Sequence, residues 1–201
     1  MKSFLMVLSV IAGVLLLFTL MIVMTFVSAF NGQRVANETA GKAWGDVEST
    51  LQRRNDLIPN LVKTVKAYAS HEDQVFTAVT EARAKVGQIN IDTASTDAAA
   101  MQKFVAAQGE LSGALSRLLV VAENYPELKA SENFLALQSQ LEGTENRINV
   151  ARTRYNEAVE ALNSRLVTIV GSIVAGFSGV EKREYFKAQE GAKQVPEVDF
   201  D

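Results

Sequence analysis

The first group of side chains that could do chemistry lies in a charged stretch between positions 53 and 83. It contains His71, the only histidine of the chain, followed directly by Glu72. A zinc-protease helix of the His-Glu type needs a second histidine four positions after the first, and Val75 stands there, which excludes that chemistry. The pair predicts a polar network that fixes helix register rather than a catalytic or pH-sensing site. The residues singled out in this stretch are Arg53, Arg54, Asp56, Pro59, His71, Glu72, Glu81 and Arg83.

The spacing of these charges argues against an active site. On a helix they would extend over ~45 Å at ~1.5 Å per residue, so they cannot meet at one substrate atom unless other helices supply the rest. The chain has no cysteine, and we recognise no pair of nucleophile and base and no phosphate-binding loop. We therefore expect no enzymatic activity, no cofactor and no metal. A small-ligand binder or enzyme that uses this charged cluster is the less favoured alternative.

A second polar set flanks the longest helical pattern of the chain. Between Phe134 and Ile169, residues recur on one stripe at steps of three and four, which is typical of a coiled-coil-like helix of some 35 residues. After Tyr155 this stripe is predicted to pass through Ala158, Leu162 and Arg165. We expect Arg53, Arg54 and Asp56 to contact Glu or Asn groups of this helix. Both sets are interpreted as a structural polar network or a partner surface. The second set comprises Glu145, Arg147, Arg152, Tyr155 and Asn156.

The elements that position these residues start from a membrane anchor. Residues 4–30 are 27 uncharged positions, about 40 Å as a helix, whereas the hydrocarbon of a bilayer is ~30 Å thick. A cleaved signal peptide is the alternative, but its apolar core has only ~7–15 residues. We predict a single-pass transmembrane helix within residues 1–34. Lys2 on one side nearly balances Arg34 and Lys42 on the other, with a slight preference for an extracytoplasmic bundle.

Residues 35–168 predict an all-α fold, an antiparallel four-helix bundle with long coiled-coil-like helices. A first helix is expected over 35–55, with Trp44 as a core anchor. The stretch 51–72 is interpreted as the membrane-distal corner, because Asp56 can cap a new helix and Pro59 fits a first helical turn. After this second helix, a loop is expected over 87–96, a third helix over 97–122, and the long fourth helix from about 131.

An apolar run follows the long helix from residue 166. Its fifteen uncharged residues are too few to span a bilayer, and four antiparallel helices bring the chain back to the membrane. We expect residues 166–180 to lie at the interface or to pack against transmembrane helices of neighbouring copies. Residues 169–201 would form this membrane-proximal segment and a flexible tail with apolar points at Tyr185-Phe186 and Phe200. The apolar residues singled out are Leu166, Ile169, Val170, Ile173, Val174 and Phe177.

Composition limits the partners. Of the 201 residues, 48% are apolar and 21% are charged, which suits a globular or membrane-attached chain. Without Lys2 the chain has 19 basic and 23 acidic residues, a net charge near −4. Nucleic-acid binding needs a concentrated basic surface, so nucleic acid is excluded as the main partner. The expected partners are the lipid bilayer, further copies of the chain and a membrane protein.

Several runs together resemble the bacterial LemA family. They are LQRRNDLIPNLVKTVKAYASHE, residues 80–83, ENYPELKASENFLALQSQLEGTENRINVARTRYNEAV and the pattern of residues 181–200. The resemblance covers nearly all of the chain after Arg34. It implies an N-terminal anchor in the bacterial inner membrane, an all-helical antiparallel bundle and no enzymatic activity. Where the family often has Phe-Pro after the long helix, this chain has Ile169-Val170-Gly171, which favours a continuous helix into the apolar run.

Two functions fit these expectations. The first is a non-enzymatic, membrane-anchored scaffold that self-associates and organises membrane or partner proteins, favoured by the long heptad helix and the second apolar segment. The alternative is an adaptor that docks a membrane protease or an envelope factor.

Overall fold

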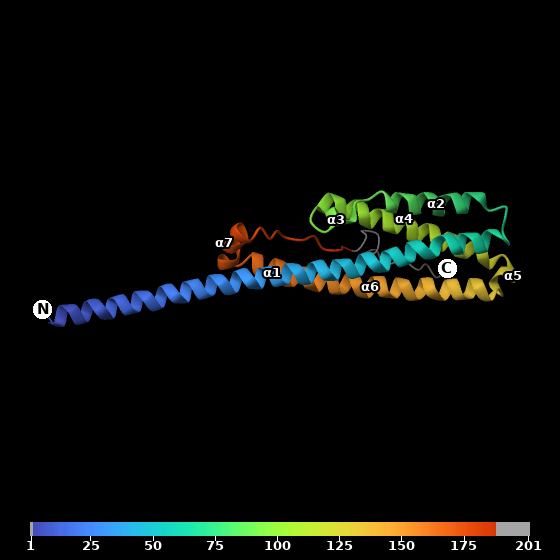
Figure 1. Cartoon of the computed structure of the whole chain (residues 1–201). Helices are drawn as coiled ribbons and strands as arrows, with labels where there is room; N and C mark the ends of the chain where they lie inside the picture. The colour runs from blue at the N-terminus through green and yellow to red at the C-terminus, as the bar shows by residue number, and fades with distance from the viewer. Residues whose placement is uncertain (1, 188–201) are drawn as a thin grey trace, which may run out of the picture.

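The computed structural model describes residues 2–187, and every regular element in this range is a helix (Figure 1). The chain runs out along the first helix, returns, runs out again and returns, which confirms the predicted all-α antiparallel fold. The helices are α1 (Lys2–Lys66), α2 (Asp73–Gly87), α3 (Ile91–Ala94), α4 (Ala98–Glu123), α5 (Pro126–Lys129), α6 (Glu132–Leu166) and α7 (Ile169–Ser178).

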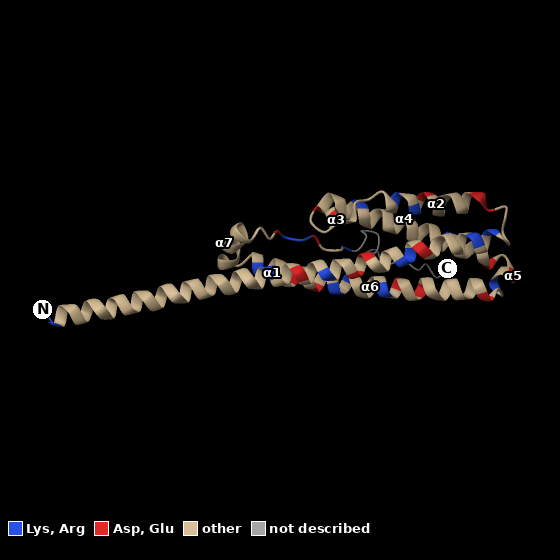
Figure 2. Cartoon of the chain, in the orientation of Figure 1, with Lys and Arg blue, Asp and Glu red and all other residues tan. Residues whose placement is uncertain are grey.

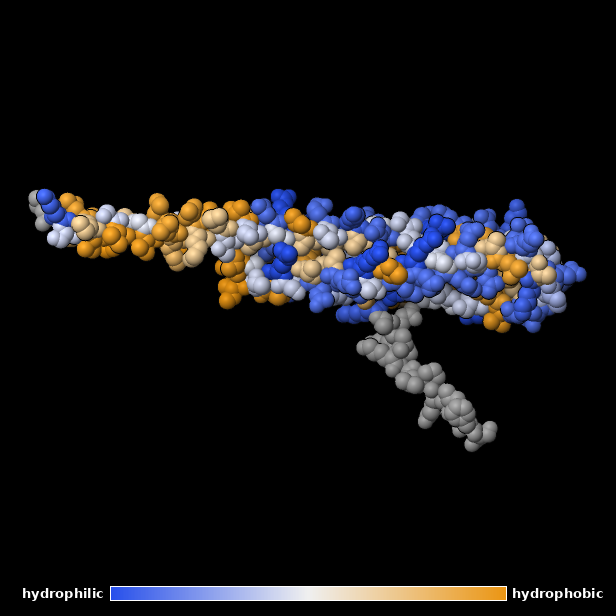
Figure 3. Space-filling model, turned by 90° about the horizontal axis from the view of Figure 1, so that it is seen from below, coloured by the Kyte–Doolittle hydropathy of each residue, from blue (hydrophilic) through white to orange (hydrophobic). Residues whose placement is uncertain are grey.

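Helix α1 is both the candidate membrane span and the first helix of the bundle. Its 65 residues extend about 98 Å without interruption. Residues 2–25 are exposed. Figure 2 shows no charge there after Lys2, and Figure 3 shows a hydrophobic surface. By length and composition, α4 and the bent pair of α6 and α7 could also cross a membrane, but α4 buries its apolar face in the bundle.

The distal turn lies within the predicted stretch 51–72, but the new helix that was predicted to begin at Asp56 and Pro59 does not start there. Helix α1 passes through Pro59 without a break, and the turn lies at residues 67–72. A proline inside a helix has no N–H, so the carbonyl of Asn55 one turn earlier loses its usual donor. The side chain of Arg83 in α2 replaces that donor, with Nε 3.2 Å from the Asn55 carbonyl oxygen. The helix therefore continues because a neighbouring helix satisfies the freed carbonyl.

Helices α1 and α6 pack side by side along a continuous seam. Helix α6 has the predicted 35 residues, but after Tyr155 its buried line passes through Val159 and Leu166 instead of the predicted Ala158 and Arg165. A helix with 3.6 residues per turn drifts away from a strict 3.5-residue repeat, which explains this shift by one position. The buried residues of α1 follow steps of three and four and are Gln33, Ala36, Ala40, Trp44, Val47, Leu51, Arg54, Ile58, Leu61 and Val65.

The core changes along the length of the bundle. Its membrane-distal part is built from apolar side chains of α1, α2, α4 and α6. In the middle, Trp44, Phe104 and Tyr155 pack with Phe186, which follows α7 in the chain. Nearest the membrane end, a small cluster joins α1 and α6 to Val180. All four long helices thus meet only in the distal part, because α2 and α4 do not reach the membrane-proximal end (Figure 1).

The predicted continuous helix from α6 into the apolar run is wrong. Helix α6 ends at Leu166, and α7 lies at 101° to it. The hydroxyl of Thr168 accepts a hydrogen bond from the Gly171 N–H at 3.0 Å and so begins a new helix. A Cβ atom at Gly171 would lie 1.8 Å from the Arg165 carbonyl oxygen. The chain can make this sharp bend because residue 171 is glycine.

The segment that follows α7 is not the predicted flexible tail. Gly179 ends α7 in the left-handed conformation, with φ 65°. Residues 181–187, called the strap from here on, then run back along the bundle and bury Phe186. The rest of the predicted tail, including Phe200, lies outside the described residues.

Candidate functional site

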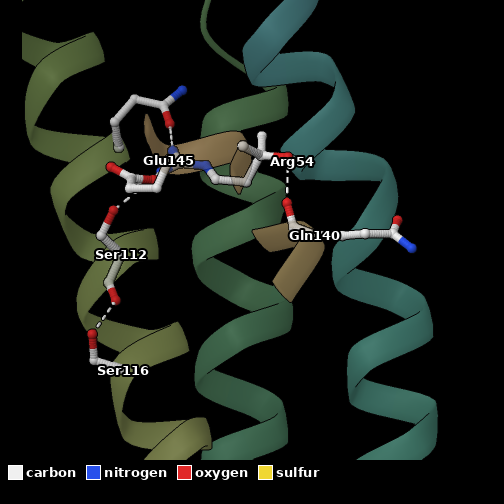
Figure 4. A network of polar contacts seen from close by, with 7 residues as sticks. Arg54, Ser112, Ser116, Gln140 and Glu145 are labelled. Carbon is white, nitrogen blue, oxygen red and sulfur yellow. Dashed lines mark hydrogen bonds and ion pairs between the residues drawn. The ribbon is translucent and has the colours of Figure 1, made fainter. Parts of the chain in front are cut away.

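Arg54 is a buried charge in the apolar seam between α1 and α6. Its side chain is 4% exposed. Its Nη1 atom donates to Glu145 Oε2 at 3.1 Å and to Ser112 Oγ at 3.2 Å, and its Nη2 atom contacts Gln108 Oε1. Figure 4 shows the guanidinium reaching from α1 toward α4 and α6. The expected contact between Arg54 and a glutamate of the long helix is present.

Arg54 and Glu145 differ in how strongly each charge is shielded from water. Burial lowers the pKa of Arg54, attraction and hydrogen bonding to Glu145 oppose this, and the nearby Arg152 charge lowers the pKa further. An arginine begins from so high a pKa that it stays charged. The Glu145 side chain is 48% exposed and keeps contact with water. The buried cation therefore depends on its partners much more than Glu145 depends on Arg54.

A half-open cavity of about 520 Å³ lies beside Arg54 between α1, α4 and α6. Four of the six α4 residues that line it are small, which leaves room between the helices. Arg152 lines the opposite side, where its guanidinium lies 4.9 Å from the centre of the Phe186 ring, and no carboxylate among the described residues pairs with it. The cavity offers cationic, hydroxyl and aromatic surface. The small residues of α4 are Gly109, Ser112, Gly113 and Ser116.

A second cavity of about 520 Å³ lies between α1, α2 and α4. Glu48 Oε1 and Asn55 Oδ1 are buried there and have no hydrogen-bond partner among residues 2–187, and the same holds for Trp44 Nε1. Burial and the nearby charge of Asp92 raise the pKa of Glu48, and the neighbouring Trp44 side chain partly opposes this shift.

A polar ladder on α6 holds the strap. Asn156 donates to the Phe186 carbonyl at 3.0 Å and accepts from the Phe186 N–H at 2.9 Å. Asn163 makes the same pair with Arg183, at 2.9 and 3.1 Å. Seven helical residues rise ~10.5 Å and three extended residues span ~10 Å, so asparagines seven apart match strap residues three apart. The two side-chain amides act as the backbone of a neighbouring β-strand would.

Further bonds fasten the strap to other elements. The buried Tyr155 hydroxyl donates to the Glu184 carbonyl at 2.9 Å, and burial raises the pKa of Tyr155 to about 12. The Glu184 N–H donates to the Ser95 carbonyl at 2.9 Å, just after α3. The Arg183 Nε atom donates to Asn37 Oδ1 of α1 at 3.1 Å. The strap therefore links α1, α3 and α6.

The other residues of the two predicted polar sets do not gather at one site. Asp56 caps no helix; it accepts a hydrogen bond from Gln52 one turn earlier, at 2.8 Å. Glu72 accepts from the Tyr125 hydroxyl at 3.3 Å, at the distal turn. His71 makes no hydrogen bond or ion pair with a described residue, so the expected His71–Glu72 network is not formed. The exposed members of the predicted sets are Arg53, Asp56, Pro59, His71, Glu81, Glu145 and Arg147.

Of the six apolar residues predicted to lie near the membrane, two are buried and four are exposed. Leu166 and Val174 are buried against the bundle. The others are exposed although they are large and apolar, namely Ile169 at 84%, Val170 at 40%, Ile173 at 58% and Phe177 at 73%.

Several important residues were not predicted. Gln108 and Ser112 complete the Arg54 site, and Arg183 and Asn163 complete the strap contacts. The repeat of asparagine at a spacing of seven on one helix face was a usable signal for the strap, because such residues share a line along the helix. Gln33 is buried in the α1 seam, and its place just after the uncharged residues 4–30 gives no sign of this in the sequence.

The described residues hold no obvious reactive centre. Within residues 2–187, no group of three or more His, Asp or Glu side chains is placed to bind a metal ion. The buried polar groups contact their own chain. The fold and these sites define a class of protein in which a helical bundle is continuous with a long apolar N-terminal helix and is closed by internal polar networks.

The chain belongs to the LemA family, whose model matches residues 43–200. The match therefore covers the bundle and α7 but not the N-terminal apolar residues 4–30. It is similar to magnetosome protein MamQ 2 of Paramagnetospirillum magneticum, with 26% identity over 201 residues covering 91% of this chain and 71% of the relative. It is also similar to magnetosome protein MamQ of Magnetospirillum gryphiswaldense, with 23% identity over 179 residues covering 81% and 66%, respectively. The resemblance to the LemA family is confirmed.

Proposed function

We propose that this protein is a non-enzymatic scaffold of the bacterial inner membrane that self-associates and organises membrane or partner proteins. The continuity of α1 is the observation that carries the proposal. From residue 31 to Lys66 the same helix rises a further ~54 Å beyond the apolar run, with α6 packed along it. With no flexible linker between span and bundle, the bundle would hold whatever it binds at a fixed height above the bilayer.

The use of the polar residues supports a structural role. Arg54, Tyr155 and Asn156 bind groups of their own chain, so they are not free to act on a substrate. Both relatives are named after a cellular structure, the magnetosome, and not after a reaction. We propose that the chain has no enzymatic activity.

Self-association is tested on the full chain. Purified protein in detergent and in nanodiscs of increasing protein content is measured by light scattering coupled to size-exclusion chromatography. The scaffold predicts a defined oligomer that dissociates on dilution. A monomer at every concentration in both environments would contradict self-association.

The adaptor for a membrane protease or envelope factor is the second candidate. The cavity beside Arg54 favours it, because Arg152 lines an open surface and has no carboxylate partner among residues 2–187. Photo-crosslinkers placed in cells at Ser116, on the cavity wall, and at exposed Arg147 as a control would separate the two functions. Crosslinking of Ser116 alone to one other membrane protein supports the adaptor, whereas crosslinks to the same chain support the scaffold.

The side of the membrane is tested separately. We propose an extracytoplasmic bundle. Reporter fusions at Asp201 that are active only outside the cytoplasm would support this orientation, and activity of a cytoplasmic reporter would reverse it.

A further inference from the structure

Helix α7 presents an apolar face that no described residue covers. Its ten residues, IVGSIVAGFS, contain no charge. Ile169 and Phe177 are 84% and 73% exposed, and Ile173 between them is 58% exposed. In water, a continuous face of this kind is unfavourable at about 25 cal/mol per Å² of apolar surface. This face would therefore be more stable in contact with apolar groups than with water.

The direction of α7 fits the plane of a membrane. It lies at 101° to α6, and α6 packs along α1, so α7 lies across the axis of the candidate span (Figure 1). Transmembrane helices are tilted on average by only about 20° from the bilayer normal. If α1 crosses the bilayer in this way, α7 lies nearly parallel to the membrane surface.

The height of α7 along α1 places it where the apolar run ends. The Phe177 ring packs edge-on against Phe26, with centroids 5.8 Å apart. The Gln33 Nε2 atom donates to the Gly171 carbonyl at 2.7 Å. Helix α7 therefore covers the stretch of α1 between positions 26 and 33, immediately before Arg34. A hydrocarbon core needs only ~20 helical residues, so its boundary on the bundle side falls in or next to this stretch.

Two cations lie at the same level. Arg34 follows the uncharged run directly, and the guanidinium of Arg165 lies against Gly32, where a Cβ atom would be 2.6 Å from Nη1. Both arginines are exposed, and neither pairs with a carboxylate among residues 2–187. Long basic side chains at this position can reach lipid phosphates while their stems lie along apolar surface.

The position of α7 is held by specific contacts. Gln33 is 1% exposed and uses both ends of its amide, since its Oε1 atom also accepts from the Ser178 hydroxyl at 3.1 Å. Val174 is fully buried on the same side. The bundle thus holds one side of α7 firmly and leaves the apolar side outward.

We propose that α7 is an interfacial helix whose face of Ile169, Val170, Ile173 and Phe177 enters the acyl–headgroup boundary of the bilayer that α1 crosses. The continuity of this face with the surface of the span, through Phe26 and Phe177, identifies lipid as the occupant. With α1 and α7 both in the bilayer, a tilt of the bundle would push α7 deeper into the bilayer or pull it out of the interface, so α7 would oppose such a tilt. The proposal does not require self-association.

The absence of cysteine in the chain allows a direct test. Ile173→Cys and Phe177→Cys variants of the full chain carry a nitroxide label and are reconstituted in phosphatidylcholine–phosphatidylglycerol vesicles. The matched control is Val150→Cys, an apolar position of α6 that is 50% exposed in the bundle. Electron paramagnetic resonance then compares collisions of each label with oxygen, which concentrates in lipid, and with a water-soluble nickel chelate.

The expected result is a severalfold higher ratio of oxygen to nickel accessibility at positions 173 and 177 than at position 150. Nickel accessibility at both α7 positions equal to that at position 150 would place α7 in water and overturn the proposal. Shielding from both reagents, with spin–spin broadening between labels, would show that a second copy covers α7 and would also overturn it. The scaffold proposal is judged separately, by light scattering on the unlabelled chain, so a failure of the α7 proposal and a failure of self-association can be told apart.

Discussion

The distal and proximal parts of the bundle are held together by different forces. In the distal part, four helices bury aliphatic and aromatic side chains such as Leu61, Phe76 and Leu118. In the proximal part only α1 and α6 lie side by side, running in opposite directions, and the strap and α7 close the open side through hydrogen bonds of Asn156 and Gln33. Apolar packing needs no precise partner, whereas these amides need particular carbonyls and N–H groups.

This difference shows how a two-helix stem can be stable near a membrane. A pair of helices alone leaves its seam open to water on both sides, and the strap covers one side at the cost of ordering only seven residues. We expect the strap and α7 to open at lower free energy than the distal helices, because they bury few apolar side chains. The four predictions below test this division.

The largest contrast is expected between two buried phenylalanines, Phe76 in α2 and Phe186 in the strap, which are 6% and 8% exposed. Replacing a buried phenylalanine by alanine costs about 3–5 kcal/mol when the whole core must adapt. Phe76→Ala should show this full cost in urea unfolding. Phe186→Ala should cost less, because the strap can detach while the helices stay packed.

Amide hydrogen exchange provides the decisive readout for this pair. Phe186→Ala should abolish protection of the Glu184 N–H, which bonds to Ser95, and leave α2 and α4 unchanged. An equal loss of protection in both parts would mean that the bundle unfolds as one unit.

The second prediction concerns the boundary between the two parts. Glu145→Leu leaves the buried Arg54 without a counter-charge and should destabilise the fold by about 3 kcal/mol. Arg54→Leu should cost less, because Glu145 is half exposed and can be hydrated. Glu145→Gln, which keeps an acceptor for Arg54, serves as the control in thermal unfolding. A larger loss for Arg54→Leu than for Glu145→Leu would show that Ser112 and Gln108 suffice for the guanidinium.

The third prediction tests why α1 continues through its proline in the distal part. Arg83→Met should cost about 1 kcal/mol, because the Asn55 carbonyl loses its donor. In a Pro59→Ala background the residue 59 N–H can donate instead, so the same substitution should cost almost nothing. The coupling is obtained from a double-mutant cycle by urea unfolding. Additive effects would contradict the proposed replacement of the missing N–H by Arg83.

The smallest effect is expected from titration of Tyr155. Because burial raises its pKa to about 12, the folded chain keeps the hydroxyl proton at pH values where the unfolded chain, with a pKa near 10, has lost it. Stability from this group is therefore complete below about pH 10 and is lost as the pH rises toward about 12. Tyr155→Phe should flatten this decline in melting temperature, whereas Tyr68→Phe at an exposed position should follow the unchanged protein.

The periodic parts of the chain could be predicted from sequence. The apolar run, the 35-residue α6, the apolar face of α4 and the anchoring role of Trp44 follow from the spacing of residues close together in the chain. The hypothesis that Arg53, Arg54 and Asp56 contact the long helix holds for Arg54, which pairs with Glu145, whereas the described residues show no such ion pair for the other two.

The largest errors lie where a distant residue changes the local rule. A proline normally limits a helix, but here Arg83, 28 positions from Asn55, removes the penalty. Nothing in IVGSIVAGFSG indicates a bend until the Arg165 carbonyl is known to lie against Gly171. A short polar tail resembles a flexible one until two asparagines seven apart are known to face it.

By itself, then, the sequence determined a long apolar span, helices of the right kind and length, and the antiparallel order of the chain, because hydrophobic periodicity is a local property. Only the tertiary structure decided where α1 ends, that α7 turns across the bundle axis, and that the strap closes the stem. These features depend on hydrogen bonds and close contacts between segments far apart in the chain, and such pairings have no local signature until the fold brings them together.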